Sequence, residues 1–101
     1  MGYEFIASID SDKHLSLEKI GEGLCSTNFY VLERSSPEVI SFRFSNIERR
    51  PDWPEDFRLC YHDNKLLLTI YGGTQQQQTK LIRDIQSVFS HQGISLTFEE
   101  I

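Results

Sequence analysis

The sequence has little cysteine, no long apolar run and no excess of basic residues. Two cysteines in 101 residues are too few for a scaffold held by disulfides. No stretch approaches the roughly 20 consecutive apolar residues that a membrane-spanning helix needs. The N-terminal residues also lack the basic start and apolar run of a signal peptide. We therefore expect a cytoplasmic protein that does not use a membrane.

The charge balance is acidic, with 10 Lys and Arg against 15 Asp and Glu and a formal net charge of −5. Nucleic-acid-binding proteins usually carry a basic excess, because neutralising phosphates supplies much of their affinity. The aromatic residues Tyr30, Phe42 and Phe44 could stack on RNA bases from a sheet surface, but the negative charge argues against a nucleic-acid partner. It favours attraction to a basic protein.

Metal-binding and catalytic motifs are missing as well. His14, His62 and His91 have neither the i,i+4 spacing nor the C-x-x-C context of a metal site, and no nucleophile elbow or P-loop occurs. Cys60 lies two positions before His62, so the two share a strand face and could form a thiol–imidazole pair assisted by Asp63. A packed cysteine beside a solvated histidine explains the same pattern. We predict a non-enzymatic protein with no catalytic residues, metal ligands or cofactor.

Hydrophobic periodicity predicts six strands and two helices. Apolar residues alternate with polar ones, or cluster in short runs, in the six segments 3–9, 29–34, 39–45, 57–62, 65–70 and 94–101. Helical spacing appears over 17–25, which Gly21 and Gly23 should shorten or fray. It appears again over 75–92, behind a capping box formed by Thr74 and Gln77 and ahead of Gly93.

The clearest local signal is a hairpin between 57–62 and 65–70. Its turn, Asp63-Asn64, consists of two residues that tolerate positive φ. A two-residue turn pairs Tyr61 with Leu66 and places every apolar residue of one strand opposite an apolar residue of the other. The same argument does not fix the register between 29–34 and 39–45, because the connecting loop has several possible lengths.

The predicted order is β-α-β-β-β-β-α-β within a single domain over residues 1–101. Two helices on one face of a mostly antiparallel sheet make an α+β fold. This order resembles the ferredoxin-like β-α-β-β-α-β plan with an additional central hairpin. That resemblance is architectural and implies no function.

The connector 47–57, I-E-R-R-P-D-W-P-E-D-F, is the most unusual segment of the chain. Pro51 and Pro54 stiffen it by restricting the residues before them. Trp53 either folds over the end of the core as a lid or serves as an exposed anchor for a partner. On the second interpretation, the protein-binding residues are Arg49, Arg50, Asp52, Trp53, Glu55 and Asp56.

These observations lead to the hypothesis of a protein-binding domain with a basic partner. One concrete form is an immunity protein or antitoxin-type inhibitor of a toxic nuclease. The alternative is a small-ligand-binding or regulatory sensor domain, with a pocket between helices and sheet, that dimerises through a sheet edge. We expect a monomer or a weak homodimer.

Overall fold

The computed structural model describes residues 3–9, 17–27, 29–44, 56–72 and 74–101. Its elements follow the predicted order. The strands are β1 (Tyr3–Ser8), β2 (Tyr30–Ser35), β3 (Val39–Phe44), β4 (Phe57–His62), β5 (Lys65–Ile70) and β6 (Glu99–Glu100), and the helices are α1 (Leu17–Cys25) and α2 (Gln75–His91). The predicted α+β class is therefore confirmed. Neither described helix is long and apolar enough to cross a membrane.

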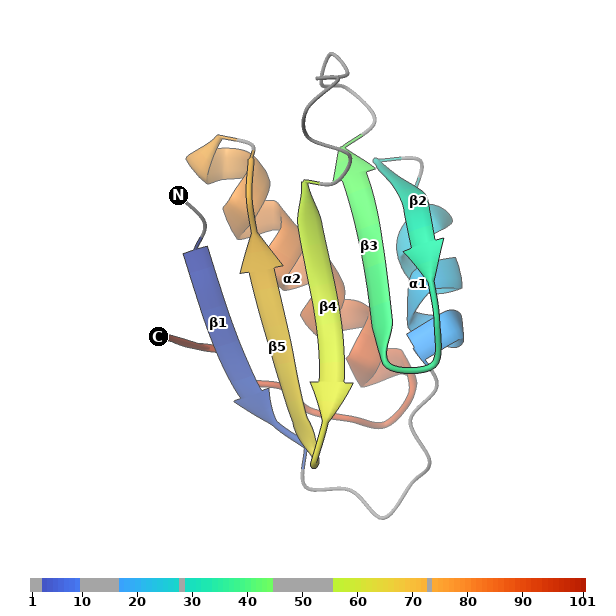
Figure 1. The fold of residues 1–101 in the computed structure, drawn as a ribbon, viewed down its shortest axis with the longest axis vertical. Helices are drawn as coiled ribbons and strands as arrows, with labels where there is room; N and C mark the ends of the chain where they lie inside the picture. Colours follow the sequence, from blue (N-terminus) through green and yellow to red (C-terminus); the bar gives the residue numbers. More distant parts are fainter. Residues whose placement is uncertain (1–2, 10–16, 28, 45–55, 73) are drawn as a thin grey trace.

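The six strands form one sheet in the order β2-β3-β4-β5-β1-β6, and every neighbouring pair is antiparallel. The β4–β5 hairpin lies in the middle of this sheet and widens it. Both helices lie behind the sheet in Figure 1 and cover the same face. In this arrangement β2 forms one edge of the sheet and β6 the other.

The β4–β5 hairpin has the register that the sequence predicts. Tyr61 pairs with Leu66, and the apolar pairs continue along the hairpin to Phe57 and Ile70. The turn residues Asp63 and Asn64 have φ of 51° and 62°. These values fit a tight hairpin turn whose twist matches that of the strands.

One hydrophobic core fills the space between the sheet and the helices. Tyr30, Phe42, Phe44 and Phe57 form an aromatic cluster within it, with the Phe42 and Phe57 rings stacked at 4.9 Å between centroids. Tyr30, Phe42 and Phe44 are at most 6% exposed. They pack beneath the helices, so the sheet does not present them to stacking bases.

Helix α1 is short, with nine residues, as the sequence predicted from its two glycines, and it is continuous through both of them. A Cβ on Gly23 would lie 2.8 Å from Cγ1 of Val88 in α2, whereas a Cβ on Gly21 would meet Phe42 at an ordinary 3.6 Å. Gly23 is therefore the residue that lets α1 approach α2 closely. Helix packing compensates for the low helix propensity of glycine.

The last strand is shorter than predicted. The sequence indicated a strand over 94–101, but only Glu99 and Glu100 pair with β1. Ile94 and Leu96 are each 6% exposed, so they face the core as predicted without joining a sheet ladder. Buried and exposed residues alternate from Ile94 to Thr97, and this alternation gave the sequence the pattern of a longer strand.

Candidate protein-binding site: the free edge of β2

Strand β2 is the most exposed long strand of the sheet. All of its residues after Tyr30 are exposed, and among the described strands only β3 pairs with it. Phe29, Val31 and Leu32 are 45%, 38% and 43% exposed. In an antiparallel sheet, alternate residues of an edge strand direct their N–H and C=O groups away from the sheet, where another strand can pair with them.

A β-bulge divides this edge into two parts. The register with β3 is regular from Tyr30 to Leu32, and it shifts between Leu32 and Arg34. Glu33, at the shift, forms an ion pair with Arg43 of β3. Bulges and charges at a sheet edge discourage pairing with other strands. The first half of β2, which is apolar and regular, is therefore the part best suited to accept one.

The two faces of β2 present different surroundings. Leu32 pairs with the core residue Phe42 and so lies on the helix side, whereas Val31 pairs with Arg43 and lies on the opposite side. On the helix side, a groove of about 300 Å³ separates α1 from β2. Its lining residues are Glu18, Gly21, Glu22, Cys25, Leu32 and Ser35.

The groove is acidic. Glu18 and Glu22 are exposed and lie one helical turn apart, so both carboxylates are on the face of α1 that borders β2. None of the described lining residues is basic. A lysine or arginine entering the groove would lay its methylene stem on Leu32 and bring its cationic head to these carboxylates.

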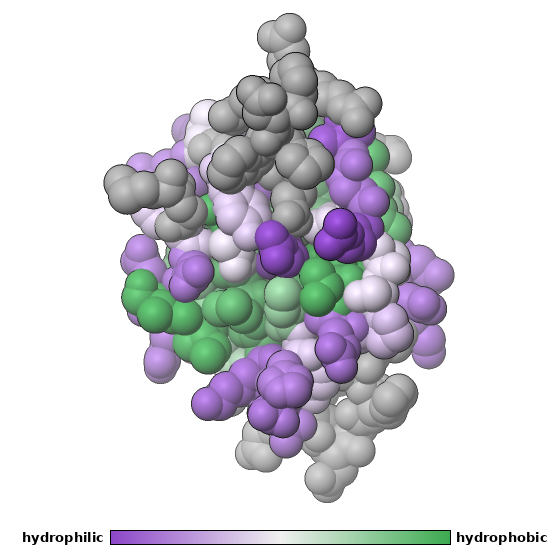
Figure 2. All heavy atoms as spheres, viewed as in Figure 1, coloured by the Kyte–Doolittle hydropathy of each residue, from purple (hydrophilic) through white to green (hydrophobic). Residues whose placement is uncertain are grey.

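The uncovered face of the sheet is a second surface to consider. It carries one row of cross-strand neighbours, Val39, Cys60, Leu67 and Ile6, and Figure 2 shows a hydrophobic band across this face. All four residues are half-buried. Among the residues that the structure describes, charged side chains of both signs lie on the same face. The charge pattern therefore does not indicate which kind of partner would bind there.

Of the predicted contact residues in the connector, the structure describes only Asp56. Asp56 is 7% exposed, and its carboxylate Oδ2 accepts a hydrogen bond from the backbone N–H of Phe44 at 2.9 Å. Its side chain therefore faces inward and holds the ends of two strands together. Arg49, Arg50, Asp52, Trp53 and Glu55 lie outside the described residues, and their contact role stays a prediction.

The cysteine–histidine pair lies on the uncovered face. Cys60 is half-buried, while the side chains of His62 and Asp63 are 80% and 84% exposed, with His62 Nε2 3.3 Å from Asp63 Oδ2. Among the described residues, no three or more His, Cys, Asp or Glu side chains gather in a way that could hold a metal ion.

The sequence contains one signal for the exposed apolar residues of β2 that its interpretation missed. The segment F-Y-V-L-E-R has apolar residues at successive positions, so both of its faces are apolar, whereas Ile40, Phe42 and Phe44 of β3 alternate with more polar residues. In a half-covered antiparallel sheet, a strand that is apolar on both sides has one side exposed.

Comparison with protein families, curated proteins and solved structures found no match to this chain.

Proposed function

We propose that this chain is a non-enzymatic protein-binding domain that accepts a strand from a basic partner at the free edge of β2. The observation that carries the proposal is the combination of an exposed apolar edge strand with an acidic groove beside it. Strand addition uses main-chain hydrogen bonds for affinity and side-chain pockets for specificity. The β2 edge offers main-chain groups that can pair with an added strand and a groove that can receive its side chains.

The geometry of the β2 edge supports one pattern of side chains in the partner strand. Residues of an added strand alternate between the helix side and the uncovered side. A residue on the helix side, next to Leu32, should be lysine or arginine, because it meets Glu18 and Glu22. A residue beside Val31 on the uncovered side should be apolar. The preferred partner strand thus alternates basic and apolar residues.

The most concrete form of this proposal is an inhibitor of the immunity or antitoxin type, bound to a basic toxic enzyme such as a nuclease. The net charge of −5 supports this form, because it accelerates encounter with a basic protein at low salt. For the fold, we propose a ferredoxin-like plan with an inserted central hairpin. In its support, each β-α-β unit, β1-α1-β2 and β5-α2-β6, has at least one other strand between its two strands.

The experiment is affinity capture from the native host at low and moderate salt, followed by purification of the captured protein and calorimetric titration. The purified partner should be basic and should bind with an affinity that falls as salt rises. Two variants test the surface. Leu32→Lys places a positive charge where the basic strand would bind and should weaken binding at least about tenfold. The Glu18→Gln, Glu22→Gln double variant removes the negative charge of the groove. It should also weaken binding at least about tenfold, which corresponds to the loss of one charged hydrogen bond or more.

The matched control is Ile101→Lys. Ile101 is 71% exposed and lies beside β1 near the opposite edge of the sheet, so it receives the same apolar-to-lysine change away from β2. This variant should bind like the wild type. Capture of an acidic partner, or equal binding by Leu32→Lys and the wild type, would contradict the proposal.

A second copy of the chain is the alternative occupant of the same edge, as in a regulatory sensor that dimerises through its sheet. The exposed apolar residues of β2 also support this alternative. Sedimentation velocity at increasing protein concentration separates the two. A concentration-dependent dimer that Leu32→Lys dissociates favours self-association, whereas a wild-type monomer favours a different partner.

A further inference from the structure

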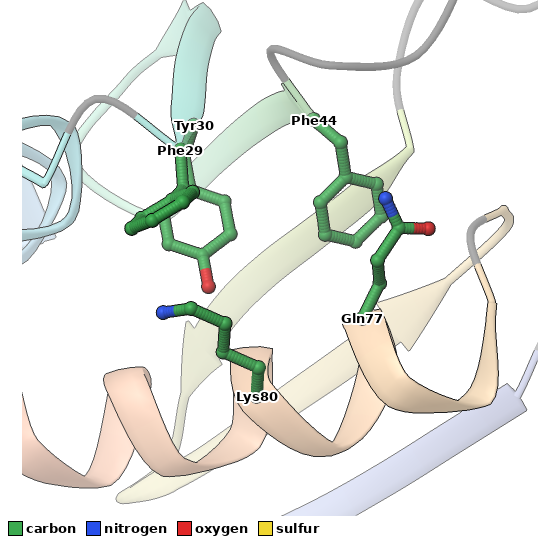
Figure 3. Close-up of a pocket in the computed structure, with 5 residues that line it drawn as sticks. All are labelled: Phe29, Tyr30, Phe44, Gln77 and Lys80. Carbon is green, nitrogen blue, oxygen red and sulfur yellow. The ribbon is translucent and has the colours of Figure 1, made fainter.

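A second cavity, separate from the groove beside α1, lies between α2 and the adjacent ends of β2 and β3. It has a volume of about 170 Å³ and is lined by Phe29, Tyr30, Phe44, Gln77 and Lys80. Figure 3 shows the aromatic rings descending from the strands, while Gln77 and Lys80 rise from the helix to meet them. This pocket goes beyond the proposed strand-binding function.

The aromatic walls are fixed from behind. Tyr30 and Phe44 are buried, with ring centroids 6.0 Å apart, and each packs on Phe57 at 5.6 Å. The third ring, Phe29, is 45% exposed and forms the outer wall. Because packed rings keep one rotamer, the pocket exists before any ligand arrives.

The polar groups that line the pocket are mainly hydrogen-bond donors. The Gln77 side-chain oxygen accepts from the backbone N–H of Thr74 at 2.7 Å in the capping box. That bond fixes which end of the amide is oxygen, and it leaves the amide nitrogen on the pocket side, near Phe44 (Figure 3). Lys80 adds an ammonium group, which lies 4.2 Å from the centre of the Phe29 ring.

Asp84 holds this arrangement from outside the pocket. Its Oδ2 accepts hydrogen bonds from the Tyr30 hydroxyl at 2.5 Å and from Lys80 Nζ at 2.7 Å. The Lys80 ammonium has three N–H donors, so one bond to Asp84 positions the group and leaves donors for a ligand. Lys80 is thus oriented by both a carboxylate and the face of an aromatic ring.

We propose that this pocket binds a small molecule with one aromatic ring and one anionic acceptor group, such as an aromatic carboxylate. Volume sets the number of rings, because an apolar cavity of roughly 150 Å³ accommodates one benzene molecule. The ring packs against the pocket-side edges of Tyr30 and Phe44, whose centroids lie 6.0 Å apart and leave no room for a ring between them. The carboxylate accepts from Lys80 Nζ and from the Gln77 amide nitrogen.

The test is an NMR titration of the ¹⁵N-labelled chain with benzoate, compared with benzylammonium and cyclohexanecarboxylate. Benzoate should shift the amide signals of the pocket residues in a saturable way, with a dissociation constant on the order of 1 mM for so small a ligand. Benzylammonium, which reverses the charge, and cyclohexanecarboxylate, which lacks the aromatic face, should each bind about tenfold more weakly.

Two variants and a control locate the site. Lys80→Met keeps the apolar stem and removes the charge, and it should weaken benzoate binding about tenfold or more, the value of one charged hydrogen bond. Phe29→Ser removes the outer wall and should weaken it as well. The matched control Lys19→Met removes an exposed lysine from α1 and should change nothing.

Three results would overturn the proposal. They are the absence of saturable shifts at the pocket, equal affinity for benzylammonium, and unchanged benzoate binding in Lys80→Met. The side chains of Lys80 and Phe29 are both substantially exposed, so neither substitution should unfold the chain, and the dispersion of the NMR spectrum verifies this.

Discussion

Asp56 Oδ2 accepts a hydrogen bond at 2.9 Å from the backbone N–H of Phe44, twelve residues earlier in the chain. The backbone of Asp56 adds three more bonds, in which its N–H donates to the Phe42 carbonyl and its carbonyl accepts from the N–H groups of Tyr71 and Gly72. One residue thereby joins the end of β3, the start of β4 and the end of β5. Asp56, which the sequence analysis included among the predicted contact residues, thus has a structural role in the sheet.

Removing this carboxylate should destabilise the fold. Asp56→Ala leaves the buried Phe44 N–H without its acceptor, and an unsatisfied buried donor costs about 1–3 kcal/mol. Urea unfolding followed by circular dichroism measures the loss. Asp56→Asn is the control, because its amide oxygen can still accept the bond and should preserve most of the stability. Equal midpoints for wild type and Asp56→Ala would contradict the assigned role.

The two glycines of α1 should respond in opposite directions to the same substitution. Gly21→Ala should stabilise the chain by roughly 0.5–1 kcal/mol, because alanine favours helix and the added Cβ has room. Gly23→Ala receives the same propensity gain but drives a Cβ against Val88. Overpacking of this kind costs about 1–3 kcal/mol, so Gly23→Ala should be less stable than Gly21→Ala by that amount.

The Gly23 prediction has an internal check. If the clash with Val88 is the cause, the Gly23→Ala, Val88→Ala double variant should lose less unfolding free energy than the two single variants lose together. If the free-energy losses of the two single variants simply add up in the double variant, contact with Val88 is not what makes alanine unfavourable at position 23. Both comparisons come from chemical unfolding under one set of conditions.

Tyr30 should make the stability of the chain fall at alkaline pH. Burial, and then the hydrogen bond to Asp84 and its negative charge, raise the pKa of Tyr30 above its ordinary value of 10.0. Below pH 10 the neutral Tyr30 hydroxyl makes its full contribution to the free energy of unfolding, because the tyrosine is protonated in both the folded and the unfolded chain. Above pH 10 the unfolded chain loses the proton first, so stability falls by at most about 1.4 kcal/mol per pH unit.

Tyr30→Phe removes this titration. Its unfolding free energy should lie below that of the wild type near neutral pH, because Asp84 loses a hydrogen bond, and should decline less steeply above pH 10. Chemical unfolding at a series of pH values between 8 and 11 measures both slopes. Parallel slopes for the two chains would show that Tyr30 is not the group responsible.

Local patterns predicted the parts of the fold that depend on local chemistry. The Asp63-Asn64 turn, the register of its hairpin and the Thr74–Gln77 capping box all follow from a few adjacent residues, and all three are confirmed. The register of β2 against β3 stayed open because the connecting loop had several possible lengths, and the bulge between Leu32 and Arg34 changes the pairing within the strand. Residues 33–35 are Glu, Arg and Ser, so no apolar residue marks the change of face that the bulge causes.

The candidate site depends on contacts that the sequence does not specify locally. Leu32 is exposed because β2 lies at the sheet edge, and Glu18 is its neighbour because α1 packs behind that strand. Both relationships are set by which strands pair over long sequence distances. The aromatic pocket likewise combines Phe29 with Lys80, residues far apart in the chain, so composition alone drew attention to the connector instead.

Hydrogen–deuterium exchange of the chain, alone and with its purified basic partner, tests the central claim most directly. The proposal predicts that amides within Tyr30–Leu32 become protected on binding, because the outward-directed N–H groups of β2 then donate to an added strand. The α1 residues that border the groove should gain a smaller protection. Protection confined to β6 or α2, with β2 exchanging at its original rate, would contradict the account.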